Sequence, residues 1–78
     1  MTETSELLER VRATGKLPAP RRRRQIREAA QVSQRELAAA LGVSVMTLNR
    51  WERGLARPRG KNAAAYASLL EQLEDATA

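Results

Sequence analysis

Cysteine and histidine are both absent from this chain of 78 residues. The chain can therefore form no disulfide, and it has no imidazole or thiolate to bind zinc or to act as a general base. Phenylalanine is also missing, and the single Trp and single Tyr offer little surface on which the bases of a single-stranded nucleic acid could stack. These absences predict a protein that is not an enzyme and has no catalytic residues, no metal site and no cofactor.

Long hydrophobic runs are also missing. No stretch of about 18 apolar residues, the length that a membrane-spanning helix needs, occurs in the sequence. The first residues are polar and acidic, unlike the basic start and apolar core of a signal peptide. We therefore expect a cytoplasmic, nucleoid-associated protein that does not bind membranes, and no pattern indicates a small-molecule ligand.

Positive charge is concentrated in the middle of the chain. The net charge is +5, but residues 16–61 alone carry +9, whereas residues 1–15 carry −1 and residues 62–78 carry −3. A concentrated positive field favours a polyanionic partner, and nucleic acid is the first candidate. Because aromatic residues for stacking on single strands are so few, double-stranded DNA is the favoured form.

The residue pattern predicts an all-α fold of about five helices, since β-branched and aromatic residues never alternate with a period of two. We expect helices at about residues 5–14, 20–30, 33–42, 44–54 and 61–75. Ser33 and Glu36 form a capping box for the third of these, Gly42 ends it, and Ser44 caps the fourth. A break that short makes two helices cross steeply, which is the helix-turn-helix arrangement.

The helix over residues 44–53 has two unlike sides. At about 100° per residue, Leu48 and Trp51 share the side that we expect to be buried. The other side carries residues that suit base edges, because Arg pairs with guanine, Asn with adenine, and Val or Met contacts the thymine methyl group. An ordinary solvated face with two stray apolar residues is the alternative. The candidate base contacts are Val45, Met46, Asn49 and Arg50.

Several other residues can be interpreted in two ways. Arg21 to Arg24 stand at the start of a helix, where the dipole disfavours positive charge, so they are either a solvated run, phosphate contacts, or an arm reaching toward the minor groove. Trp51 could stack on a base, but its position beside Leu48 favours the core. Tyr66 is also expected in the core, with its hydroxyl group at the rim.

The segment from Ser33 to Gly54 resembles the Cro/C1-type (XRE) helix-turn-helix family of transcription regulators. The resemblance rests on Gln-x-x-Leu-Ala from Gln34 and on Trp-Glu-x-Gly from Trp51, and it covers about residues 22–73. It implies a compact, lambda-repressor-like bundle, to which the helix expected at about residues 5–14 adds an extra N-terminal helix. We accordingly divide the chain into an N-terminal helix with a Pro-containing linker, residues 1–19, and a helix-turn-helix DNA-binding domain, residues 20–78.

The resemblance also implies roles for individual residues. Gln34 would bind a backbone phosphate, and Arg27 and Glu52 would form a structural ion pair. Val45 stands where many members have a polar residue, so we expect it to contact a thymine methyl group rather than adenine. The expected phosphate contacts are Gln34, Arg22, Arg23, Arg24, Arg35, Thr47, Arg53, Arg57, Arg59 and Lys61.

The sequence therefore predicts a repressor-like transcription regulator that binds double-stranded DNA as a homodimer and reads the major groove with helix 44–53. An alternative is an antitoxin or adaptor that retains the helix-turn-helix and binds a protein partner. A third possibility is an architectural protein that binds DNA with weak specificity. Members usually continue into one more helix than we expect here, so the N-terminal helix either covers the surface left open or packs against a second subunit.

Overall fold

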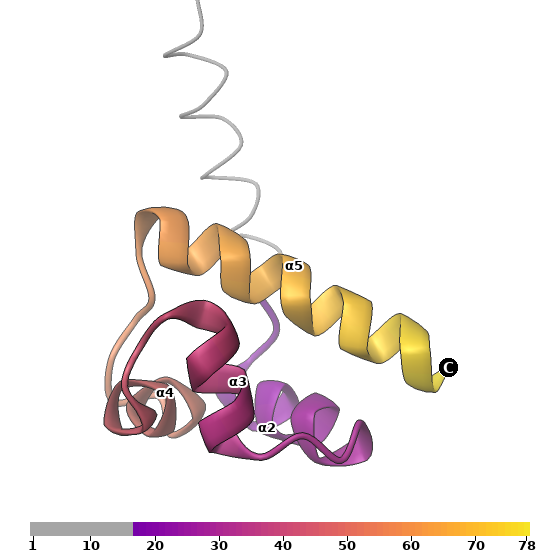
Figure 1. Cartoon of the computed structure of the whole chain (residues 1–78). Helices are drawn as coiled ribbons and strands as arrows, with labels where there is room; N and C mark the ends of the chain where they lie inside the picture. Colours follow the sequence, from indigo (N-terminus) through magenta and orange to yellow (C-terminus); the bar gives the residue numbers. More distant parts are fainter. Residues whose placement is uncertain (1–16) are drawn as a thin grey trace, which may run out of the picture.

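The computed structural model describes residues 17–78 (Figure 1). Within that range the chain forms four helices and no strand: α2 (Pro20–Ala29), α3 (Gln34–Leu41), α4 (Val45–Glu52) and α5 (Gly60–Thr77). The all-α prediction is confirmed for this part of the chain, and none of these helices combines the length and apolar character needed to cross a bilayer. The helix predicted at about residues 5–14 lies outside the described residues.

Short-range hydrogen bonds place the ends of α3 and the start of α4. The Ser33 hydroxyl accepts a bond from the Glu36 amide, and the Glu36 carboxylate accepts one from the Ser33 amide, both at 3.0 Å. The second of these bonds lowers the pKa of Glu36. The Ser44 hydroxyl accepts the amide of Thr47 at the start of α4. Gly42 ends α3 with a φ of 69°, a left-handed conformation that glycine adopts without strain.

The helix boundaries differ from the sequence prediction by one or two residues, and α2 and α5 show the physical reason. α2 ends at Ala29, and Gln31 then takes a φ of 59°, a conformation that usually requires glycine or asparagine. The amides of Gln31 and Val32 bond to carbonyls in the last turn of α2, and these bonds hold the strained residue in place. α5 begins at Gly60 and continues to Thr77, because neither glycine nor proline follows to stop it at residue 75.

The core lies between α5 and the layer formed by the other three helices (Figure 1). The aromatic rings of Trp51 and Tyr66 stack with their centroids 5.3 Å apart, and this contact joins α4 to α5. The prediction that Trp51 belongs to the core is confirmed, since only 4% of it is exposed. The buried residues of the cluster are Ile26, Leu37, Ala38, Leu48, Trp51, Tyr66 and Leu70.

Tyr66 is buried more deeply than the sequence prediction allowed, so the placement of its hydroxyl at the rim was wrong. None of the residue is exposed, and its hydroxyl has no hydrogen-bond partner among residues 17–78. The guanidinium of Arg23 covers the ring, with its Cζ atom 5.7 Å from the ring centroid. This burial raises the pKa of Tyr66 to about 12.

The Tyr66→Phe variant is expected to be at least as stable as the wild type at neutral pH, because it removes a buried hydroxyl without a partner. Above pH 10, tyrosine ionises in the unfolded chain but not in the folded one. The wild type should therefore lose up to about 1.4 kcal/mol of unfolding free energy per pH unit until pH exceeds the folded pKa. Urea unfolding of both proteins across this range measures the difference, and equal pH dependence would contradict our account.

Candidate nucleic-acid interface

The candidate site lies on α4 and the N-terminal end of α3. The Val43 amide bonds to the Ala38 carbonyl at 3.0 Å, and this bond closes the end of α3 before the chain turns into α4. The two helices consequently run in different directions (Figure 1). Leu48 and Trp51 anchor α4 in the core, with 0% and 4% of each residue exposed. The opposite side of α4 is therefore held toward solvent.

The solvent-facing side of α4 is both apolar and cationic. Val45 and Met46 are exposed at its N-terminal end, Asn49 is half-buried, and Arg50 is exposed one turn further along. Arg50 and Arg53 form no ion pair and no side-chain hydrogen bond within residues 17–78. The structure thus brings the four candidate base-contact residues onto one short helix that is fixed by the core behind it.

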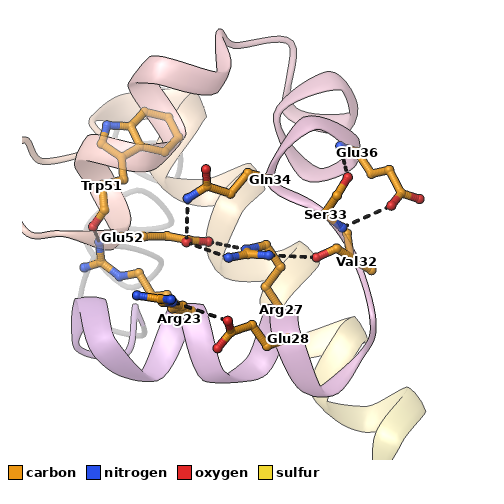
Figure 2. A network of polar contacts seen from close by, with 10 residues as sticks. Arg23, Arg27, Glu28, Val32, Ser33, Gln34, Glu36, Trp51 and Glu52 are labelled. Atoms are coloured by element: carbon orange, nitrogen blue, oxygen red, sulfur yellow. Dashed lines mark hydrogen bonds and ion pairs between the residues drawn. The ribbon is translucent and has the colours of Figure 1, made fainter.

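A buried ion pair joins α2 to α4. Arg27 donates from Nε to Glu52 Oε2 at 2.6 Å and from Nη2 to Glu52 Oε1 at 3.0 Å (Figure 2). The third guanidinium nitrogen, Nη1, donates to the Val32 carbonyl at 2.9 Å. Only 10% of the Arg27 side chain and 1% of the Glu52 side chain are exposed, and the hydrogen bonds to Glu52 raise the pKa of Arg27. The pair therefore has the bidentate geometry that a buried charge pair needs.

Gln34, the first residue of α3, extends this network. Its Nε2 atom donates to Glu52 Oε1 at 3.0 Å, so Glu52 binds both α2 and α3 (Figure 2). An amide nitrogen carries two hydrogens, and one of them remains for an outside acceptor. Sequence reasoning paired Glu52 only with Arg27 and missed this second bond, since nothing in the spacing of Gln34 and Glu52 indicates it.

An open pocket of about 510 Å³ lies beside Gln34. Arg24 and Arg53 place two exposed cations at its wall, and the capping residue Ser33 lies at the start of α3. The positive end of a helix dipole and two guanidinium groups together suit an anion. The lining residues are Arg24, Arg27, Ser33, Gln34, Asn49, Glu52 and Arg53.

Arg23 does not fit the predicted role of a phosphate contact. Its Nε atom donates to the Pro18 carbonyl at 2.7 Å and its Nη1 atom to the Trp51 carbonyl at 3.2 Å, while the guanidinium covers Tyr66. Burial lowers the pKa of Arg23. The sequence held a signal for this inward position, because Arg23 lies three residues before the buried Ile26 and thus on the same side of α2.

The other predicted phosphate contacts are arranged in three ways. Arg22 pairs with Glu74 of α5, and Arg24 pairs with Glu28 at 3.4 Å; all four side chains are largely exposed. The Thr47 hydroxyl is half-buried and accepts a bond from the Ser44 hydroxyl at 2.9 Å. Five predicted phosphate contacts are exposed cations that have no ion-pair partner within the described residues: Arg35, Arg53, Arg57, Arg59 and Lys61.

Comparison with known proteins identifies one family. A model described as helix-turn-helix matches residues 24–74, which is more than half of the chain and includes α3, α4 and most of α5. No significant match was found among curated proteins, and none among solved structures. Within residues 17–78, no cluster of acidic or other ligating side chains could hold a metal ion.

Proposed function

The chain belongs to the Cro/C1-type (XRE) helix-turn-helix family of DNA-binding domains, and on this premise we propose that it is a transcription regulator that recognises a specific double-stranded DNA sequence. The observation that carries the proposal is the solvent-facing side of α4, where residues suited to base edges stand on a helix anchored by Leu48 and Trp51. The major groove of B-DNA is wide enough for such a helix. We therefore assign α4, with its flanking residues 44 and 53, as the recognition helix.

We assign base recognition and phosphate binding to different residues. Base edges would be contacted by Val45, Met46, Asn49 and Arg50. Phosphates would be bound by the free N–H of Gln34 and by the cations around it. Arg23 is left out because two of its three guanidinium nitrogens donate inside the fold. Arg22 and Arg24 can also reach phosphate, since exposed ion pairs are weak and readily exchange. The remaining proposed phosphate contacts are Arg35, Thr47, Arg53, Arg57, Arg59 and Lys61.

A second copy of the chain completes the proposed complex. One α4 offers few base contacts, and a specific affinity in the usual range then needs two half-sites about one turn of DNA apart. We propose a symmetric homodimer on DNA that acts as a repressor, with residues 20–78 as the DNA-binding domain and residues 1–19 as a separate N-terminal part.

Selection of bound duplexes from random DNA, with the full chain, tests the proposal. We expect a recurrent sequence with two-fold symmetry, and an affinity for it that falls steeply with salt, because each phosphate contact adds about 0.9 to the logarithmic slope. Equal affinity for the selected and scrambled duplexes would instead indicate an architectural protein. Absence of DNA binding together with a stoichiometric protein partner would indicate an antitoxin or adaptor.

A further inference from the structure

Exposed apolar side chains are few in this domain, and two of them are neighbours. Among residues 17–78, the exposed large hydrophobic residues are Val45, Met46 and Leu55, with exposed fractions of 41%, 65% and 65%. Single exposed apolar residues are ordinary on protein surfaces, but Val45 and Met46 form a pair at the first turn of α4. They contribute little to the core, so the reason for their residue types must lie outside the fold.

The polar side chains at the same end of α4 bond to the helix cap. The Ser44 hydroxyl accepts the Thr47 amide at 3.0 Å and donates to the Thr47 hydroxyl at 2.9 Å. Both hydroxyl groups therefore serve the helix cap. The Thr47 hydroxyl accepts here and keeps its hydrogen for the phosphate contact proposed above. The side chains that remain to touch a base at this end are Val45 and Met46, and neither carries a strong hydrogen-bond donor or acceptor.

The charge around this pair identifies its partner as DNA rather than an apolar protein surface. Arg50 follows Met46 by one helical turn, and Arg50 and Arg53 have no ion-pair partner in residues 17–78. In the major groove, the apolar group that a base presents is the C5-methyl group of thymine. An apolar pair flanked by cations thus fits a methyl group on the edge of a polyanion.

Resting on the proposed function, we propose that Val45 and Met46 recognise the C5-methyl group itself, so that 5-methylcytosine is accepted at the positions where they contact thymine. Thymine and cytosine differ at C4, where one has an oxygen acceptor and the other an amino donor. Val and Met side chains bond to neither group. Val45 and Met46 therefore distinguish a methylated from an unmethylated pyrimidine, but they do not distinguish thymine from 5-methylcytosine.

The test measures how much the C5-methyl group contributes to binding affinity, first in a thymine–adenine pair and then in a cytosine–guanine pair. Each thymidine of the selected duplex is replaced in turn by deoxyuridine, which lacks only the methyl group. At the sensitive positions, cytosine paired with guanine is then compared with 5-methylcytosine paired with guanine. Loss of one buried methyl group should lower affinity about three- to five-fold, and its addition to cytosine should raise affinity by the same factor.

Two variants serve as a matched pair in this experiment. The double variant Val45→Ala, Met46→Ala should bind the methylated and unmethylated duplexes equally, whereas Leu55→Ala, which removes an equally exposed side chain outside α4, should keep the full methyl effect. Two outcomes overturn the inference although the wild type binds its selected duplex. One is equal affinity for thymidine and deoxyuridine at every position, and the other is a methyl effect that survives in the double variant. Failure to select any duplex overturns the proposed function as well.

Discussion

The Glu52→Ala variant is expected to lose about 3–5 kcal/mol of unfolding free energy, because it leaves a buried charge without its partner. Arg27 would keep its position against the Val32 carbonyl but lose both bonds to the carboxylate, and Gln34 would lose its acceptor. A domain of this size has a total stability near the lower end of about 5–15 kcal/mol. Urea unfolding followed by circular dichroism should show a large unfolded fraction of the variant without denaturant.

The control for this prediction replaces both partners. The double variant Arg27→Met, Glu52→Leu buries no charge, so we expect it to be far more stable than Glu52→Ala and close to the wild type. If the double variant were as unstable as the single one, packing volume rather than charge would explain the loss.

The Arg50→Ala variant should bind the selected duplex about 1–3 kcal/mol more weakly, because a bidentate contact to guanine contributes about that much to discrimination. The variant should fold normally, since Arg50 is exposed and forms no ion pair within residues 17–78. Its loss of affinity should be confined to one base pair in each half-site, where the variant becomes tolerant of substitution. Competition binding with all single base-pair changes, at one salt concentration, measures this tolerance.

Arg53→Ala provides the comparison for Arg50→Ala. Both arginines are exposed and lie at the C-terminal end of α4, but Arg53 lines the pocket beside Gln34, where we propose a phosphate. Its removal should weaken binding to all sequences alike. It should also lower the slope of log affinity against log salt concentration by about 0.9, the contribution of one phosphate contact. Identical base preferences and identical salt slopes for the two variants would contradict the assignment of separate roles.

Features of the fold that depend on neighbouring residues could be predicted from the sequence. The caps at Ser33 and Ser44 and the left-handed Gly42 involve hydrogen bonds between residues within five positions of one another. The two sides of α4 follow from helical periodicity, which places Leu48 and Trp51 together wherever the helix packs.

Features that depend on distant contacts could not be predicted. The deep burial of Tyr66 follows from the way α5 lies against Arg23 and Trp51, and the pairing of Arg22 with Glu74 joins residues 52 positions apart. Gln31 differs from these cases, because its left-handed conformation is unfavourable for its residue type and is held by hydrogen bonds at the end of α2. For Tyr66 and Arg22 the side-chain type permits several positions, and packing against another helix selects one.

Because Gln34 donates to Glu52, we expect a change at the buried ion pair to affect thermal stability and DNA affinity in different ways. An apolar pair at positions 27 and 52 would preserve or raise the melting temperature, but it would free the Gln34 amide to rotate among several rotamers. Ordering that side chain again on DNA would reduce the affinity. Sequences selected for heat tolerance alone should therefore change toward an apolar pair and bind DNA more weakly, while selection for tight binding should retain the charged pair.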